Sequence, residues 1–191
     1  MLEPDPLEWR RLLGDGARAL LWALGIALIV LPPFWFGYLF WWKPHGPFVP
    51  APPQLPMDDE LARLLVAVLP GGIAVPIAAY VHHVLGQLLV IGLPEEAFYR
   101  GYLQTAFDDI WRPRWRVLGA LVGPGLLVTS VLFALGHVFT KVDPNRLAVF
   151  FPSLLFGWLR ARTGGVGASI AFHALCNLFA SFLGRSYGFG E

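Results

Sequence analysis

Residues 64–94 read LLVAVLPGGIAVPIAAYVHHVLGQLLVIGLP and contain no Asp, Glu, Lys or Arg across 31 positions. At about 1.5 Å per residue, one straight helix of this length would measure about 46 Å, whereas a hydrocarbon core is about 30 Å thick. We therefore expect the stretch to enter a membrane and to bend or break. The candidate kink points are Pro70, Gly71, Gly72 and Pro76, and His82-His83 is a candidate turn before a second helix from about Val84 to Phe107.

Other uncharged blocks lie on both sides of this stretch. They are Ala19–Trp42, Val117–Gly136, the short Leu147–Leu159, and Thr163–Gly184. Because each block has helical rather than strand length, we expect an all-α fold. The prediction is a polytopic transmembrane bundle of about six helices, some kinked or short, in a single integral-membrane domain spanning 1–191.

The segments between the blocks suggest how the chain meets the membrane surface. The aromatic residues of 34–42 resemble an interfacial belt, and the proline-rich 44–56 predicts an extended loop. Arg10, Arg11 and Arg18 favour a cytoplasmic N-terminus, and the same rule would make Arg112, Arg114 and Arg116 cytoplasmic. Six crossings would put that second group outside, unless region 64–107 crosses only once. The sequence leaves both topologies open.

Composition excludes several classes of protein. Hydrophobic residues make up 56% of the 191 positions and charged residues only 14%, which is too apolar for a soluble domain. The net charge of +1 and the scattered basic residues do not indicate a nucleic-acid partner. The single cysteine, Cys176, cannot form an internal disulfide. The expected surroundings are therefore a lipid bilayer, and the oligomeric state is left open.

Three polar groups interrupt the apolar blocks. Inserting a charged side chain at membrane depth costs at least about 2.5 to 3.5 kcal/mol, so we expect each group to have a structural or functional role. The groups are Glu95-Glu96 with Arg100, Phe133 with His137, and His173 with Asn177. Residues four apart share a helix face, so Glu96 is expected to pair with Arg100, whereas Glu95 is turned by about 100° and remains unpaired.

This set of side chains suits peptide hydrolysis. A partly desolvated Glu95 could take a proton from water, and Tyr99, four residues later, could hydrogen-bond it or pack as an aromatic ring. The imidazoles of His137 and His173 and the amide of Asn177 could stabilise the oxyanion that forms when water attacks a carbonyl. The expected catalytic residues are Glu95, Glu96, His137, His173 and Asn177, supported by Arg100, Phe133 and Tyr99, with no metal and no cofactor.

The order Glu-Glu-x-x-x-Arg, Phe-x-x-x-His and His-x-x-x-Asn on separate apolar segments resembles the CPBP family of CAAX prenyl endopeptidases and bacteriocin-processing relatives. The resemblance covers about residues 64–184. It implies a glutamic-type intramembrane protease without bound metal, in which Glu95 activates water and His137, His173 and Asn177 support it. Compact bacterial members include the myxosortases, which cut C-terminal membrane anchors. By that likeness the substrate is a membrane-anchored protein or peptide with a C-terminal sorting or anchor segment, and the location is a bacterial inner membrane.

Two other functions remain open at this point. A zinc-dependent intramembrane protease could use Glu and two His as ligands, although no His-Glu-x-x-His is present. A non-enzymatic scaffold or immunity protein could keep the polar core for packing alone. Zinc content separates the first from a glutamic enzyme, and the phenotype of Glu95→Gln separates the second.

Overall fold

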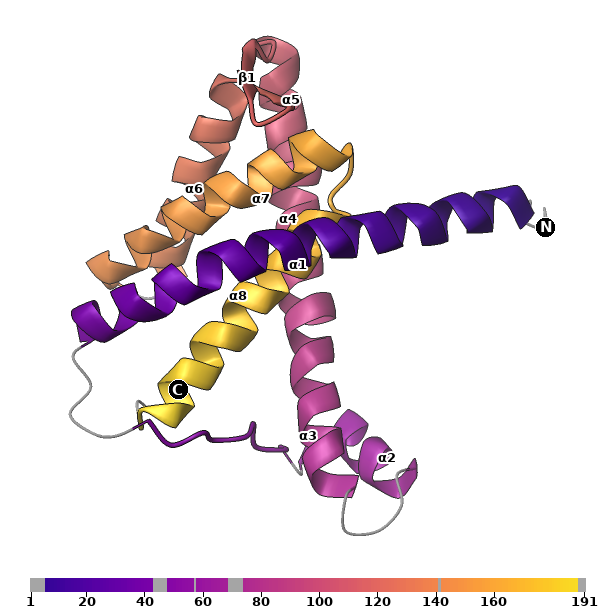
Figure 1. Ribbon diagram of the computed structural model, residues 1–191, viewed down its shortest axis with the longest axis vertical. Helices are drawn as coiled ribbons and strands as arrows, with labels where there is room; N and C mark the ends of the chain where they lie inside the picture. The colour runs from indigo at the N-terminus through magenta and orange to yellow at the C-terminus, as the bar shows by residue number, and fades with distance from the viewer. Residues whose placement is uncertain (1–5, 43–47, 57, 69–73, 141, 189–191) are drawn as a thin grey trace. The chain divides into compact units, whose positions relative to one another are not determined.

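The structure is a computed structural model that describes residues 6–42, 48–56, 58–68, 74–140 and 142–188 (Figure 1). Its α-helices are α1 (Pro6–Trp42), α2 (Glu60–Val68), α3 (Ala74–Leu85), α4 (Leu93–Glu96), α5 (Gln104–Ile110), α6 (Pro124–Thr140), α7 (Phe150–Thr163) and α8 (Gly167–Ser186). Two π-helical segments, η2 (Gly86–Gly92) and η3 (Ala97–Leu103), and a 3₁₀ helix, η4 (Pro144–Val149), join them. The only strands in the described part of the chain are β1 (Trp115–Val117) and β2 (Ala120–Val122).

Length and composition allow three helices in the described ranges to cross a membrane: Asp15–Phe40, Val75–Ile110 and Gly167–Ser186. Helix α6 is apolar but shorter. The predicted all-α membrane fold is confirmed.

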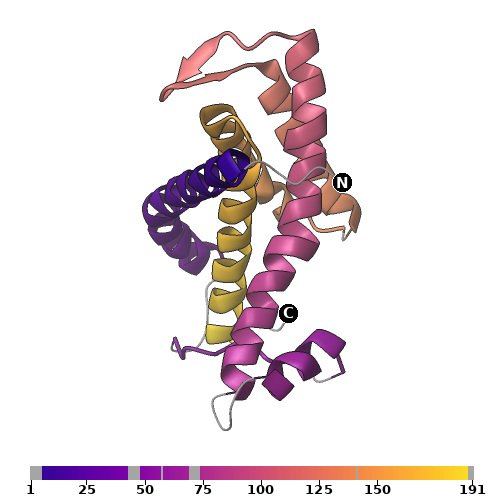
Figure 2. The same cartoon turned by 90° about the vertical axis from the view of Figure 1, so that its right-hand side faces the viewer.

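The turn predicted at His82-His83 is wrong, because the chain stays helical from Ala74 to Ile110 (Figure 2). Neither histidine breaks a helix, and Pro76 lies in the first turn of α3, where its missing N–H costs nothing. Region 74–110 is therefore one long candidate span, with π-helical turns on both sides of α4. The other predicted kink points, Pro70, Gly71 and Gly72, lie outside the described residues.

A π-helical turn directly precedes Pro94, which is the second residue of α4. Proline has no N–H for the helix ladder, and its ring crowds the carbonyl four residues earlier. A wider turn at such a position relieves the conflict, and π-helical turns are often found at functional sites. Here the widening positions Glu95 and Glu96 in the middle of the long helix.

The chain divides into two compact units that alternate along the sequence. Unit 1 contains residues 1–26 and 92–173, and unit 2 contains 27–91 and 174–191. The buried large side chains of unit 1 are Arg100, Phe133, Phe156, Leu159 and Phe172. Helix α7 approaches its neighbours through Gly157, where an added Cβ would lie 2.8 Å from Gln104 Oε1. Small residues allow this close packing of membrane helices.

The span predicted for Val117–Gly136 begins later than expected, at Pro124. Its first residues instead form an antiparallel hairpin in which Trp115 pairs with Val122. The turn needs positive φ at both Leu118 (45°) and Gly119 (81°), the geometry of a tight two-residue hairpin turn. Glycine adopts such an angle readily but leucine does not, so only Gly119 is a residue type that indicates this turn.

The last span also begins later than Thr163, which is the final residue of α7. Gly164 adopts φ 80° and donates its N–H to the carbonyl of Arg160, which ends that helix. Helix α8 then starts at Gly167, and its twenty residues are long enough for a crossing.

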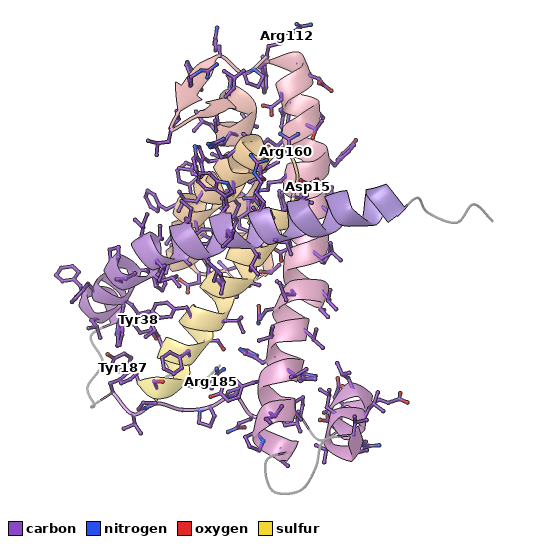
Figure 3. All side chains as sticks on the ribbon, turned by 45° about the vertical axis from the view of Figure 1, so that its right-hand side comes forward. Asp15, Tyr38, Arg112, Arg160, Arg185 and Tyr187 are labelled. Atoms are coloured by element: carbon purple, nitrogen blue, oxygen red, sulfur yellow. The ribbon has the colours of Figure 1, made fainter. Side chains whose placement is uncertain are left out.

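Unit 2 uses part of the predicted aromatic belt as a packed cluster. Phe34 and Trp35 contact Phe179, and Tyr38 stacks on Tyr187 with 6.2 Å between ring centroids (Figure 3). Other rings of the same run face outward: Phe36 is 74% and Phe40 78% exposed. The described part of the predicted loop, residues 48–56, is non-helical as expected. Residues 44–47 and the side chains of Trp41 and Trp42 lie outside the described part.

Candidate active site

Glu96 and Arg100 form a fully buried ion pair in unit 1. Arg100 Nη1 donates to Glu96 Oε1 over 2.9 Å, and neither side chain has any solvent exposure. The i,i+4 spacing predicted this contact. One charge alone would be very costly in so dry a place, and the ion pair places a countercharge beside each residue.

Arg100 also contacts α7 and two aromatic rings. Its Nη2 donates to the carbonyl oxygen of Ser153 over 3.1 Å and to the hydroxyl of the same residue. The guanidinium carbon lies 4.4 Å from the ring centroid of Phe133 and 5.1 Å from that of Phe156. Both contacts are cation–π interactions. Sequence reasoning missed Ser153 and Phe156, because nothing in the apolar block around them indicates a partner 53 residues away.

His173 brings α8 into the same network. Its Nδ1 lies 2.9 Å from Glu96 Oε1, and its ring stacks on Phe156 with 4.8 Å between centroids. A carboxylate only accepts hydrogen bonds, so Nδ1 carries the proton that it donates to Glu96. In the neutral imidazole Nε2 is then an acceptor, and it lies 3.9 Å from Glu95 Oε2.

His137 is fixed by its own helix. Its Nδ1 lies 3.0 Å from the backbone carbonyl oxygen of Phe133, and the two rings are 4.5 Å apart. The carbonyl must accept, so Nδ1 again carries hydrogen and the neutral ring has a bare Nε2. Donation from Nε2 to an oxyanion therefore requires a second proton on the ring.

Glu95 and His137 line one cavity of about 240 Å³. The two neighbouring carboxylates thus have different surroundings, since the Glu95 side chain is 34% exposed and that of Glu96 is fully buried. Glu95 Oε2 is a buried oxygen without a hydrogen-bond partner in the described part of the protein, and it lies on the side of His173 Nε2. The full lining is Glu95, Tyr99, Gly136, His137, Thr140 and Arg146.

Seven of the eight predicted residues meet in unit 1: Glu95, Glu96, Tyr99, Arg100, Phe133, His137 and His173. Tyr99 shares the cavity with Glu95, and its ring packs against Phe133 at 5.0 Å. The eighth, Asn177, lies one helical turn after His173 on α8, in unit 2. Sequence reasoning missed Thr140 and Arg146, which follow the apolar block in a segment that gave no signal.

The described ranges contain no group of three or more His, Cys, Asp or Glu arranged to hold a metal ion. The acidic and imidazole groups of this site bind one another instead, as the contact between His173 and Glu96 shows. The zinc alternative therefore gains no support from the geometry, and zinc analysis remains its test.

Comparison with known proteins gives one match. Residues 77–179, just over half of the chain, match the family described as Type II CAAX prenyl endopeptidase Rce1-like. No curated protein and no solved structure gives a significant match.

Proposed function

The chain belongs to the Rce1-like type II CAAX prenyl endopeptidase family, and on that premise we propose that Glu95 activates the water that hydrolyses a peptide bond of a membrane-associated substrate. The observation that carries this proposal is the contrast between the two carboxylates. Glu96 is fully buried, and its Oε1 is bound by both Arg100 and His173, whereas the Glu95 side chain is 34% exposed and lines the cavity.

The chemistry follows from that contrast. Water placed in the cavity gives a proton to Glu95 as its oxygen attacks the scissile carbonyl carbon. The tetrahedral oxyanion then collapses, the C–N bond breaks, and the proton on Glu95 passes to the departing amine. The products are a carboxylic acid and an amine, and Glu95 is returned to its ionised form.

We assign Glu96 and Arg100 a positioning role. Arg100 holds Glu96, and Glu96 holds the Nδ1–H of His173, so that Nε2 points toward the side of Glu95. A neutral His173 can therefore accept a hydrogen bond from the attacking water and orient it.

We assign His137 and Asn177 the role of stabilising the negative charge that develops on the carbonyl oxygen of the substrate. His137 lies at the cavity and stabilises the oxyanion when its ring carries a second proton. Asn177 can donate from its side-chain amide without titrating, and its part in the mechanism rests on the family motif. Replacing either residue is expected to lower the activity, because it removes a group that can donate to the oxyanion.

The proposed substrate is a C-terminal sorting or anchor segment of a membrane protein, and the proposed location is a bacterial inner membrane. Both rest on the short bacterial relatives that the motifs resemble. Mass spectrometry of membrane-protein C-termini in wild-type and Glu95→Ala cells tests the substrate. An unchanged set of C-termini would contradict this sorting role.

The catalytic proposal is tested with Glu95→Gln in purified, reconstituted full-length protein. Loss of general-base catalysis should lower the rate by about 10²- to 10⁴-fold. Asp109→Asn is the matched control, because Asp109 is an exposed acid on the same long helix and does not line the cavity. A folded Glu95→Gln variant with full activity would overturn the proposal, as would stoichiometric zinc whose removal abolishes activity.

A further inference from the structure

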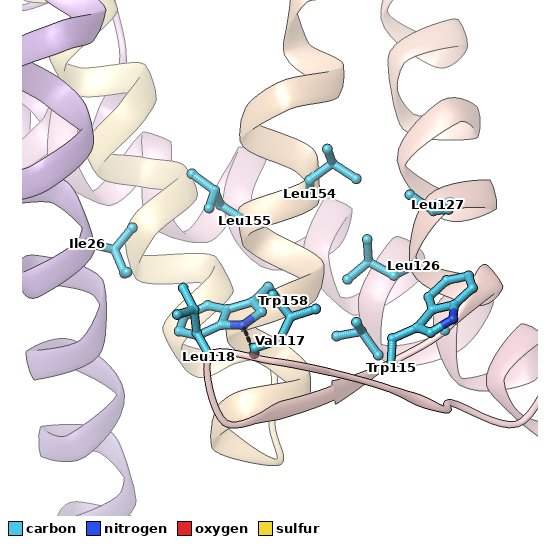
Figure 4. Close-up of a pocket in the computed structure, with 11 residues that line it drawn as sticks. Ile26, Trp115, Val117, Leu118, Leu126, Leu127, Leu154, Leu155 and Trp158 are labelled. Carbon is cyan, nitrogen blue, oxygen red and sulfur yellow. Dashed lines mark hydrogen bonds between the residues drawn. The ribbon is translucent and has the colours of Figure 1, made fainter.

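A second cavity of unit 1, of about 370 Å³, lies between the β1–β2 hairpin and helices α6 and α7 (Figure 4). Side chains of Trp115, Leu118, Leu126, Leu155 and Trp158 point into it, and the hairpin is held there because Trp158 Nε1 donates to the carbonyl of Val117 over 2.9 Å. The lining contains no charged residue, and none of the proposed catalytic residues takes part. The size lies at the lower end of the roughly 300–1,000 Å³ of ligand pockets.

Arginines lie directly beside this apolar cavity. Arg112 and Arg114 line a separate hollow of about 330 Å³ together with Trp111, Pro113 and Pro124. Figure 3 shows Arg112 close to the end of α5. Neither arginine forms an ion pair within the described ranges; the nearby Asp108 is bound by Arg160 over 3.1 Å.

The residues that line the two hollows are adjacent along the chain at two places. Arg114 lines the charged one and the next residue, Trp115, lines the apolar one; Pro124 and Gly123 are divided in the same way. One molecule with an anionic head and an apolar tail could therefore fill both. We propose that this is a binding site for an anionic phospholipid of the bilayer, with an acyl chain in the apolar cavity and the phosphate at Arg112 and Arg114.

The membrane setting favours this occupant over other amphiphiles. The hairpin joins the end of a candidate span to the start of an apolar helix, so its arginines and tryptophans belong at headgroup depth. Guanidinium groups bind phosphate through paired, charge-assisted hydrogen bonds, whereas a zwitterionic headgroup adds a cation that these arginines would repel. The proposal does not depend on the peptidase mechanism.

The test is competition between phosphatidylglycerol and phosphatidylcholine of identical acyl chains, followed by native mass spectrometry of the full-length protein. We expect wild-type protein to retain phosphatidylglycerol about tenfold more than phosphatidylcholine, because both lipids offer a phosphate but only phosphatidylcholine adds a cation that the arginines repel. Arg114→Gln should remove most of that preference. Arg116→Gln is the matched control, because Arg116 is an exposed arginine two residues away that lines neither hollow.

A second measurement locates the acyl chain. Phosphatidylglycerol with a photoreactive group on its chain should label peptides that contain Leu126 or Leu155, and Leu155→Trp should reduce the labelling. Equal retention of the two lipids, or an equal effect of Arg114→Gln and Arg116→Gln, would overturn the proposal. So would labelling of these peptides only by a lipidated peptide, because the cavity would then hold a substrate's tail.

Discussion

Arg100 is a guanidinium without solvent exposure inside a candidate membrane span, so its neighbours decide whether the helix is tolerated there. Glu96 supplies the countercharge and Ser153 supplies two acceptors. The rings of Phe133 and Phe156 lie against the guanidinium. This arrangement leaves little room for a substitute, because lysine lacks the planar fork that reaches Glu96 and Ser153 at once.

Replacing Arg100 with Met should destabilise the protein by about 3 to 5 kcal/mol, because Glu96 would remain as a buried and poorly compensated charge. Thermal unfolding in detergent measures the effect. The double variant Glu96→Gln/Arg100→Met should recover much of the loss, since a neutral amide can still accept from His173. If the double variant were as unstable as the single one, the ion pair would not be the source of the effect.

At the scale of helices, Gly136 of α6 leaves room for the Tyr99 side chain of the segment η3. A Cβ at this position would lie 2.7 Å from the Tyr99 hydroxyl, which is closer than real Cβ contacts. Gly136→Ala should therefore displace the Tyr99 ring inside the cavity that Glu95 also lines. We expect the free energy of unfolding to fall by about 1 to 3 kcal/mol. We also expect it to lower peptidase activity.

Two variants test whether the loss of stability comes from the contact with Tyr99 or would follow from any glycine-to-alanine change in this region. Tyr99→Phe removes the clashing oxygen, so combining it with Gly136→Ala should restore the thermal stability. Gly101→Ala is the matched control, because the nearest atom to its added Cβ lies at an ordinary 3.7 Å. Equal losses in Gly101→Ala and Gly136→Ala would show that close packing against Tyr99 is not responsible.

The start of α2 carries a pH-dependent contact. Asp59 accepts backbone hydrogen bonds from Leu61 and Ala62, and its other oxygen lies 3.6 Å from His82 of α3. The bond from Ala62, with smaller effects of Leu61 and His82, holds the pKa of Asp59 below its usual range. A lowered pKa means that the contact stabilises the folded state above the ordinary carboxyl range and is lost as the pH falls through the lowered value.

Hydrogen–deuterium exchange of the Leu61–Ala62 amides measures this contact. At neutral pH these amides should exchange faster in Asp59→Ala than in wild-type protein, and the difference should shrink toward acidic pH. Asp59→Asn can still cap the helix but does not titrate, so its exchange relative to Asp59→Ala should stay constant with pH. A wild-type difference that is independent of pH would contradict this account.

Across the whole molecule, contacts between residues of the same helix were the part of the structure that the sequence predicted. The i,i+4 rule found the pairing of Glu96 with Arg100 and the shared face of Phe133 and His137, because such contacts depend only on helix geometry. Ser153 could not be found, since its contact with Arg100 depends on how α7 packs.

Helix boundaries were harder to predict than helix existence. Hydropathy does not distinguish the hairpin at 115–122 from the apolar helix that follows it, and the turn depends on Leu118 accepting a positive φ. The histidine pair suggested a turn, yet His82 contacts Asp59 from an unbroken helix. In neither case did the local pattern of polar and apolar residues predict the backbone conformation.

The alternation of the two units along the chain has a consequence for biosynthesis. Residues 92–173 complete unit 1 and residues 174–191 complete unit 2. Neither unit can therefore be complete until α8, the last of these helices, has been synthesised. The same helix supplies His173 to one unit and Asn177 to the other. A nascent chain that stalls before α8 therefore carries Glu96 without the imidazole of His173, and we expect it to be unable to cut neighbouring proteins while it is still being inserted.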